Sequence, residues 1–393
     1  MIHPDEAVRL IEGLDCRLGA ERLPLASALG RVPSEEIRAL LDQPPFDKAT
    51  MDGFAYATAD GAAAGPGASF AIVDAIAAGS PPPPPLAAGE CVRIMTGAPV
   101  PACACAVHRL ERSEVAGARF SIAAREDDLN IVRRGANRRA GDSLFPRRRL
   151  RPQDIALLAS DGAAEVGVVS RPRVAVLSTG CELRSPGEVL SPGSIYDSNG
   201  PLFVAQAETA GCEASFEGIV PDDEGALRAA IRAASEHADL LIISGGVSAG
   251  DFDFVPEALE RSGFSVLFRK IAMRPGMPAL LCRRGGKFAY GMPGNPVSAF
   301  VNFEVIVKPL LSRFAGLVYE PDLARVRKGA AILREVAERV EFLPVELRDG
   351  IASPLRYTGA TMLDALSRAD ALVRLEIGQR EIPEGAETLA RLL

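Results

Sequence analysis

Four acidic side chains each follow a predicted strand by a few residues and could share one site. They are Glu182, Asp222, Asp251 and Asp253. Mg²⁺ prefers one or two carboxylates together with oxygen atoms of a substrate, and a phosphate group supplies such oxygen atoms. An acid that precedes a helix can instead cap it, which is the alternative interpretation of Asp222 and Asp253. As a set, the four acids favour a metal and phosphate site.

Two loops rich in small residues add backbone groups to this chemistry. Ser178-Thr179-Gly180 and Ser244-Gly245-Gly246 each end a short apolar run. Glycine lets the backbone approach a ligand closely because it carries no side chain. Both loops are therefore candidate ligand contacts.

Residues 171–320 must position these groups, and their pattern predicts an α/β domain. Apolar runs alternate with helical stretches, which is typical of a doubly wound, mostly parallel sheet with helices on both faces. The expected strands are 174–177, 219–220 and 240–243, and the expected helices follow Asn199 and cover about 223–237 and 254–261. Ligands of such sheets bind at the carboxyl ends of the strands. We therefore expect the acids and the two loops on one rim of the sheet.

Two further features of this domain suit an anionic ligand. Lys270 and Arg274 lie four residues apart in a segment too rich in proline for one helix. Loop cations are usually solvated, but cations near several acids can hold a multiply charged ligand whose other side a metal holds. Asn295 and Pro296 suit the N-cap and first position of a helix, and a helix start offers free N–H groups to an anion.

The expected fold is a multidomain α/β protein with a helical N-terminal part, a β-rich insert and a small C-terminal β domain. The insert is predicted from short segments separated by turns, and the C-terminal domain from a series of short strands. The predicted domains are 1–45 with 131–170 (helical, linking), 46–130 (β-rich insert), 171–320 (central α/β) and 321–393 (C-terminal β).

Composition narrows the class of protein. The 393 residues are 48% hydrophobic and 24% charged, as in a globular protein, and the net charge of −7 disfavours unspecific binding to nucleic acid. The seven cysteines include no C-x-x-C pair, so no zinc knuckle is expected. The sequence has neither a signal peptide nor an apolar run of about 18 residues, so we expect no membrane association and a cytoplasmic location.

Other catalytic arrangements find little support in the residues. Asp52 lies in a Met-Asp-Gly turn, and turn chemistry alone explains an Asp-Gly pair as well as catalysis does. The three histidines, His3, His108 and His237, lie near no nucleophile motif, so no Ser-His-Asp arrangement is expected.

Seven motifs occur in order along nearly the whole chain. They are Pro45-Phe-Asp-Lys-Ala-Thr-Met-Asp-Gly-Phe-Ala55, Ile94-Met-Thr-Gly-Ala-Pro-Val-Pro101, Arg173-Val-Ala-Val-Leu-Ser-Thr-Gly180, Ile195-Tyr-Asp-Ser-Asn199, Ser244-Gly-Gly-Val-Ser248, Lys270 with Arg274-Pro-Gly276, and Met292-Pro-Gly-Asn-Pro-Val-Ser-Ala299. Together they resemble one known family, molybdopterin molybdotransferase, the MoeA-type enzyme related to the gephyrin C-terminal domain.

The resemblance implies insertion of molybdate into adenylylated molybdopterin with release of AMP, a magnesium-dependent step of molybdenum cofactor synthesis. Molybdate is then a substrate and Mg²⁺ the cofactor. The resemblance also implies a homodimer with a site shared between subunits, and a contact with the molybdopterin adenylyltransferase. In such a site, metal and cations stabilise the charge that develops as a P–O bond breaks.

The resemblance also assigns roles to residues of this chain. Asp52 and Thr96 would reach the site from the partner subunit. The implied catalytic residues are Asp52, Asp222, Lys270 and Arg274, the implied metal ligands are Glu182, Asp222 and Asp253, and the implied substrate-binding residues are Thr96, Ser178, Thr179, Gly180, Ser244, Gly245, Gly246, Pro293, Asn295 and Pro296.

Several positions depart from the family pattern and support an alternative. Asn137 stands where an acid is usual, Met277 where a lysine is usual, and Cys181 where an aspartate or another polar residue is common. Asn137 cannot act as a base and Met277 carries no charge. The alternative is a catalytically weakened paralogue that acts as a pterin-binding or scaffold protein. A third possibility, an adenylyltransferase acting one step earlier, is disfavoured by the additional domains.

Overall fold

The computed structural model describes residues 1–393 except 247–253, 336 and 356–361. The chain forms two compact units. The large unit comprises Met1–Arg22, Gly30–Ser34 and Gly167–Leu393, and the small unit comprises Leu23–Leu29 and Glu35–Val166. This division does not separate the four predicted domains, so the four-domain boundaries stay a prediction.

A six-stranded sheet forms the centre of the large unit. Its strands are β11 (Arg173–Thr179), β14 (Glu213–Val220), β15 (Leu240–Ser244), β16 (Ser265–Lys270), β18 (Pro278–Arg284) and β19 (Lys287–Met292). Their spatial order is β14-β11-β15-β19-β18-β16. Strands β14, β11, β15 and β19 run parallel, and β18 runs antiparallel to both of its neighbours. The predicted mostly parallel sheet is confirmed.

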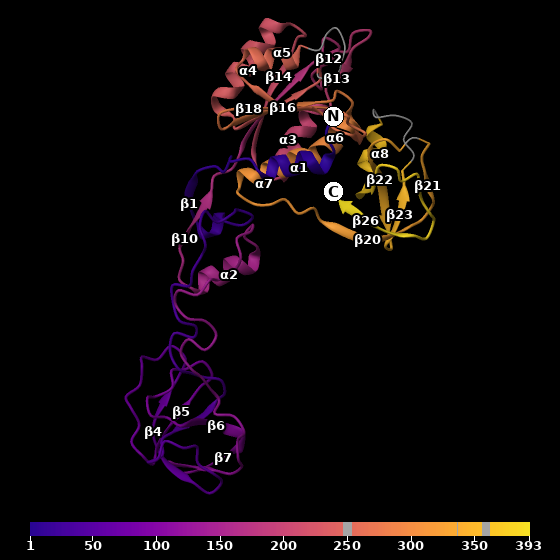
Figure 1. Cartoon of the computed structure of the whole chain (residues 1–393). Coiled ribbons are helices and arrows are strands. Elements are labelled where there is room, and N and C mark those ends of the chain that lie inside the picture. The colour runs from indigo at the N-terminus through magenta and orange to yellow at the C-terminus, as the bar shows by residue number, and fades with distance from the viewer. Residues whose placement is uncertain (247–253, 336, 356–361) are drawn as a thin grey trace. The chain divides into compact units, whose positions relative to one another are not determined.

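Helices cover both faces of this sheet (Figure 1). α4 and α5 lie on one face, and α1, α3, α6 and α7 pack against the other. The helical segments are α1 (Pro4–Glu12), α3 (Asn199–Thr209), α4 (Glu224–His237), α5 (Val255–Arg261), α6 (Pro296–Asn302), the π-helical segment η3 (Phe303–Val307) and α7 (Lys308–Phe314). A short parallel pair, β12 (Leu183–Arg184) and β13 (Ile195–Tyr196), lies in the connection from β11 to α3.

The apolar sequences of the strands explain why helices pack on both faces of the sheet. All five residues of β15 are buried, as expected for a strand that packs on both faces. In β11, Val174 and Val176 pack in one core cluster with Phe203 of α3, whereas Ala175 and Leu177 pack in the other with residues of α4. Successive side chains of a strand point to opposite faces, so one apolar run builds two cores.

A small closed β domain follows the central domain in the large unit. Its ring runs β22-β23-β20-β26-β24, and β24 pairs back onto β22. Its elements are β17 (Met273–Arg274), β20 (Leu323–Lys328), β21 (Ile332–Leu333), β22 (Val340–Arg348), β23 (Ile351–Pro354), α8 (Leu363–Ser367), β24 (Ala371–Leu375), β25 (Glu381–Ile382) and β26 (Glu387–Leu392). The predicted C-terminal β domain is confirmed.

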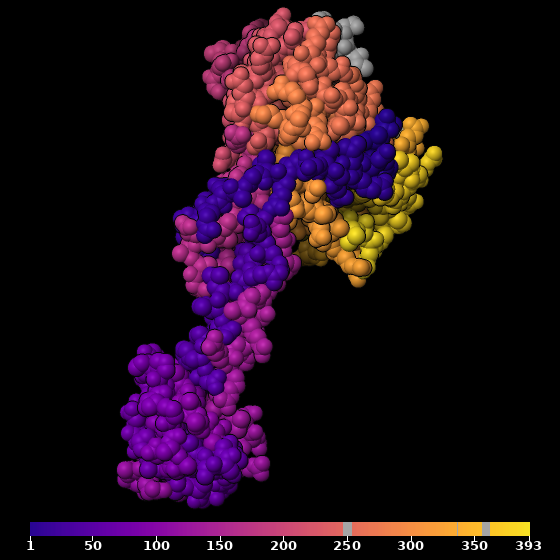
Figure 2. Space-filling model, turned by 60° about the vertical axis from the view of Figure 1, so that its left-hand side comes forward, coloured from indigo at the N-terminus to yellow at the C-terminus, as the bar shows by residue number. Residues whose placement is uncertain are grey.

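The first residues of the chain join the large unit. The Ile2 amide donates to the Lys270 carbonyl at 2.9 Å, and the Ala272 amide donates to the Ile2 carbonyl at 2.7 Å. Buried Ala7 and Ile11 of α1 then extend the core that α7 lines. Figure 2 shows the N-terminal residues, in indigo, against the orange residues of this unit.

The small unit holds the predicted β-rich insert. Its main sheet has the order β6-β3-β5-β4-β8-β7. Phe54 and Phe120 stack in its core with their ring centroids 4.5 Å apart. Its elements are η1 (Leu25–Ser27), β2 (Lys48–Ala49), β3 (Gly53–Tyr56), β4 (Ser69–Ile76), β5 (Glu90–Ile94), β6 (Ala106–Arg109), η2 (Leu110–Arg112), β7 (Ser113–Ala116), β8 (Arg119–Ile122), β9 (Ile131–Val132) and α2 (Pro152–Ser160).

The chain passes between the two units through paired strands β1 (Ala20–Pro24) and β10 (Glu165–Val169). Within the described part of the chain, no helix has both the length and the apolar character needed to span a membrane.

Candidate active site

The two predicted loops meet at the carboxyl ends of β11 and β15. Ser178 pairs with Ser244 in the parallel register, and both side chains are buried. Gly245 follows with φ +92°, and a Cβ atom on it would lie 2.5 Å from the Thr179 carbonyl oxygen. A larger residue at 245 therefore conflicts with both the backbone conformation and the neighbouring loop.

Asp222 reaches back from the end of β14 to the first of these loops. Its Oδ1 accepts from Thr179 Oγ1 at 2.7 Å, and its Oδ2 accepts from the Cys181 amide at 3.1 Å. The cap of α4 is the next residue, Asp223, whose Oδ1 accepts from the Ala226 amide at 2.8 Å. The interpretation of Asp222 as a helix cap is therefore wrong, because its side chain faces the rim instead.

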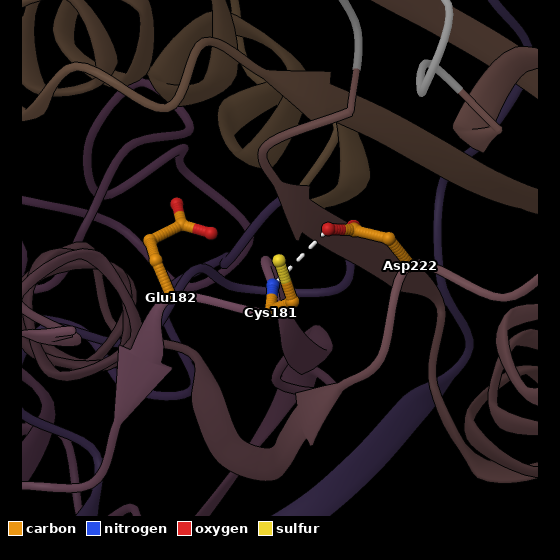
Figure 3. A group of neighbouring side chains, drawn as sticks. All are labelled: Cys181, Glu182 and Asp222. Atoms are coloured by element: carbon orange, nitrogen blue, oxygen red, sulfur yellow. Dashed lines mark hydrogen bonds between the residues drawn. The ribbon is translucent and has the colours of Figure 1, made fainter. Parts of the chain in front are cut away.

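The side chains of Cys181 and Glu182 lie close to the carboxylate of Asp222. One potential ligand atom from each of the three residues lies within 4.8 Å of the others. In Figure 3 the carboxylates of Glu182 and Asp222 lie on either side of the Cys181 side chain. Cys181 had no predicted role in metal binding, although its position between the β11 loop and Glu182 was a signal that could have identified it.

Glu182 and Asp222, but not Cys181, line a pocket of about 480 Å³ at the rim of the sheet. The pocket brings together most of the site residues predicted in the central domain. These are Thr179, Gly180, Glu182, Asp222, Ser244, Gly245, Gly246, Pro293, Asn295 and Pro296. Ser178 lies beneath them, fully buried in β11. Asn295 occupies the N-cap position of α6, but its side chain makes no capping hydrogen bond, contrary to the prediction.

Asp197 and Asn199 also line the pocket and were missed as site residues. Asn199 Nδ2 donates to Ser244 Oγ and to the Gly294 carbonyl, both at 2.8 Å, and so ties three loops together. Asp197 Oδ1 accepts from the amides of Asn199 and Gly200. The signal was present in the motif 195–199, which contributed to the resemblance but carried no predicted site residue.

The two predicted cations lie outside the pocket lining. Lys270 ends β16 opposite Pro278, which does line the pocket. Arg274 lies in β17, and its Nε is 3.7 Å from Glu341 Oε1 of β22. Glu341 also accepts a hydrogen bond from Arg334. The carboxylate of Glu341 thus already balances part of the charge of Arg274.

Asp52 and Thr96 lie together in the small unit. Asp52 Oδ1 accepts from both the amide and the Oγ1 of Thr96, each at 2.7 Å. These hydrogen bonds, the side-chain one first, hold the pKa of Asp52 below its ordinary value of 3.8. Asp52 is therefore ionised at neutral pH. The predicted metal ligand Asp253, and Asp251 with it, lie outside the described residues.

Three family models match the chain in succession. Residues 2–162 match the MoeA N-terminal region (domain I and II), residues 175–313 match a "probable molybdopterin binding domain", and residues 330–393 match the MoeA C-terminal region (domain IV). The chain is therefore a multidomain protein in which a domain similar to molybdopterin-binding domains lies, in sequence, between two regions that match MoeA.

Two known proteins are similar in sequence to most of this chain. The molybdopterin molybdenumtransferase of Staphylococcus aureus strain Mu50 is 37% identical over 315 residues, which are 79% of this chain and 75% of that one. That of Staphylococcus epidermidis strain ATCC 35984 is 35% identical over 316 residues, with the same coverage of 79% and 75%.

Solved structures show the same fold. A molybdopterin biosynthesis MoeA protein of Pyrococcus horikoshii matches with a TM-score of 0.86 and 31% identity, over 100% of this chain and 99% of that one. A second structure from that organism matches with a TM-score of 0.85 and 26% identity, over 100% of both chains. The chain belongs to the MoeA family of molybdopterin molybdenumtransferases. The family resemblance and the fold class predicted from sequence are confirmed.

Proposed function

We propose that the chain inserts molybdate into adenylylated molybdopterin and releases AMP. The observation that carries this proposal is the pocket at the strand ends, where Asp222 joins the β11 loop and Glu182 flanks it. Such a rim suits a ligand with a pyrophosphate group, because glycine loops offer backbone N–H groups and carboxylates can share a cation with phosphate oxygens.

The described donors fit the Mg²⁺ that the family implies. Glu182 and Asp222 supply two carboxylates, and the Gly180 position leaves room for the Glu182 carboxylate, since a Cβ atom there would lie 2.7 Å from Oε2. When bound, the ion supplies positive charge against phosphate oxygens. Asp222 holds the Thr179 hydroxyl and the Cys181 amide, which keeps the loop in place around the ligand.

The remaining predicted residues bind the anionic ligands or complete the site from a second subunit. Lys270 and Arg274 bind anionic groups at the rim. The protein acts as a homodimer in the cytoplasm, and Asp52 with Thr96 completes the site from the partner subunit. Its substrate arrives from the molybdopterin adenylyltransferase by direct contact. The ionised state of Asp52 supports a role in which it accepts hydrogen bonds or binds a cation.

Release of AMP tests the proposal. Purified protein with adenylylated molybdopterin, Mg²⁺ and molybdate should release AMP, and omission of Mg²⁺ or molybdate should abolish the release. No AMP above a control without protein would refute it. Tight binding of the pterin without turnover, together with turnover in Asn137→Asp, would instead identify the weakened paralogue.

A further inference from the structure

We propose that Glu341 of the C-terminal β domain is a positioning residue, which orients Arg274 for binding of molybdate, and that Arg334 holds Glu341 in place. This role rests on the proposed function, in which Arg274 binds anionic groups. It adds the residues that fix the direction of the Arg274 guanidinium group, and it gives the C-terminal β domain a part in binding the oxyanion.

The backbone places Arg274 beside Glu341. Strand β17 pairs in parallel with β22, and the register puts Arg274 opposite Glu341. The strands before and after β17 in the chain, β16 and β18, belong to the central sheet, whereas β17 belongs to the sheet of the C-terminal domain. Paired residues in register present their side chains to the same face of a sheet. The pairing therefore brings two charged side chains from different domains together.

The carboxylate of Glu341 lies between two arginines. Its Oε1 is 3.7 Å from Arg274 Nε, and its Oε2 accepts a hydrogen bond from Arg334 Nη1 at 3.3 Å. The side chain of Glu341 is 10% exposed and that of Arg334 is 5% exposed. A buried carboxylate requires a partner charge, and Arg334 supplies it. Two positive charges and one negative charge leave one net positive charge for a ligand.

Backbone carbonyls fix the guanidinium group of Arg334. Its Nε donates to the Gln379 carbonyl at 2.6 Å, its Nη1 donates to the Arg339 carbonyl at 2.9 Å, and its Nη2 donates to the Glu376 carbonyl. A guanidinium group is planar and its donors point in fixed directions, so these hydrogen bonds set the orientation of the whole group. The hydrogen bond to Glu341 Oε2 therefore starts from a rigid donor.

Arg274 keeps its outer nitrogen atoms for a ligand. Its side chain is 53% exposed, and no described residue accepts a hydrogen bond from it. Because Glu341 faces the Nε atom, the two terminal amino groups are left to bind. Two N–H donors of one guanidinium group match two oxygen atoms of a tetrahedral oxyanion, as they do for phosphate.

The segment that follows Arg274 is held against the wall of the pocket. The Gly276 carbonyl accepts from Asn302 Nδ2 at 3.0 Å, and a Cβ atom on Gly276 would lie 2.2 Å from that nitrogen. Asn302 belongs to α6, whose first residue, Pro296, lines the pocket. Since the backbone of this segment is fixed on both sides, the direction of the Arg274 side chain is the freedom that Glu341 restricts.

Binding of molybdate tests the proposal without the pterin. Full-length protein is dialysed to equilibrium against radiolabelled molybdate at low ionic strength. We expect Glu341→Gln to raise the Kd for molybdate about tenfold, since a hydrogen bond to a charged group contributes at least that factor. The sign is diagnostic. Removal of a negative charge near an anion site strengthens binding if charge alone matters, and weakens it if Glu341 orients Arg274.

Two double variants separate positioning from folding. Arg274→Ala with Glu341→Gln should bind molybdate as weakly as Arg274→Ala alone, because no guanidinium group is left to orient. Glu341→Gln alone leaves Arg334 as an unpaired buried charge, which destabilises a fold. Glu341→Gln with Arg334→Met removes both buried charges and should show the same tenfold loss, with its folded state checked by thermal unfolding.

Glu346→Gln is the matched control, because Glu346 lies on the same strand and pairs with Arg348 and Arg368. It should keep the wild-type Kd. Unchanged or tighter binding in Glu341→Gln, an equal loss in Glu346→Gln, or no binding to the wild type would each overturn the proposal. A further loss when Glu341→Gln is added to Arg274→Ala would overturn it too.

AMP release distinguishes failure of this role from failure of the proposed function. In Glu341→Gln, the KM for molybdate should rise about tenfold while kcat stays close to that of the wild type, because the lost interaction orients a binding group. A wild type that binds molybdate through Glu341 but releases no AMP would refute the transferase activity alone. AMP release with the same KM for molybdate in both proteins would refute the positioning role alone.

Discussion

At the scale of residues, Asp222 and Asp223 are adjacent acids with different tasks. Asp222 holds the β11 loop, and Asp223 caps α4. Asp222→Asn should lower AMP release about 10- to 100-fold, as changes around a metal site do, because asparagine carries no charge and keeps only one acceptor oxygen for the two donors, the Thr179 hydroxyl and the Cys181 amide. The measurement is the rate of AMP release at saturating Mg²⁺.

Asp223→Asn is the control for Asp222→Asn, since it removes the same charge and asparagine is an equally good N-cap. It should keep the wild-type rate. Equal losses in both variants would mean that net charge near the rim matters and that the position of Asp222 does not.

The sequence predicted the loops of this site better than the side chains around them. Glycines after an apolar run mark a loop wherever the strand ends, so Gly180 and Gly245 were found. Either Asp222 or Asp223 could have capped α4, because only the directions of the two side chains distinguish them. The partner of Arg274 was also invisible, since Glu341 comes from a distant strand.

At the scale of elements, the close packing of the β11 and β15 loops makes Gly245 essential. Gly245→Ala should lower the thermal unfolding temperature and abolish AMP release, because its methyl group meets the Thr179 carbonyl oxygen and its φ of +92° disfavours alanine. Both effects are read from a thermal scan and the AMP assay on the same preparation.

Gly193→Ala is a control that distinguishes the steric clash with Thr179 from the conformational cost of alanine at a positive φ. Gly193 has φ +84° and no atom within 4 Å of a Cβ position, so its variant carries only the backbone cost, about 1 kcal/mol. It should keep full activity. If Gly193→Ala is as inactive as Gly245→Ala, contact with Thr179 does not explain the effect.

The elements themselves were largely predictable, and the exceptions were short. The central strands and α4 follow from apolar runs and from the helical spacing of Leu227, Ile231 and Ala234. Strand β13 has only two residues, too few for a periodic pattern, so the sequence did not show that Asp197 and Asn199 after it face the pocket. Short elements are fixed by tertiary contacts, which local patterns do not contain.

At the scale of the whole molecule, the proposed sharing of the site between subunits predicts complementation. Asp52→Ala and Asp222→Asn should each be nearly inactive alone. The co-expressed mixture should regain about one quarter of the wild-type activity, because about half of randomly formed dimers are mixed and each mixed dimer has one intact site of two. AMP release after co-expression and random assembly measures this.

Complementation fails if each subunit supplies both residues to its own site, since no chain in the mixture then carries an intact pair. A mixture as inactive as either variant, with mixed dimers demonstrated by mass spectrometry, would refute the shared site and leave the pocket of the large unit as the whole site.

The hydrogen bonds of Ile2 link two parts of the chain mechanically. The Ile2 amide donates to the Lys270 carbonyl, and the Ala272 amide donates to the Ile2 carbonyl. Separation of these two segments therefore exposes both amides to hydrogen exchange. The segment that carries Lys270 and Arg274 therefore cannot move far alone. Any displacement that brings these cations toward a bound anion either takes the first residues of the chain along or breaks both hydrogen bonds.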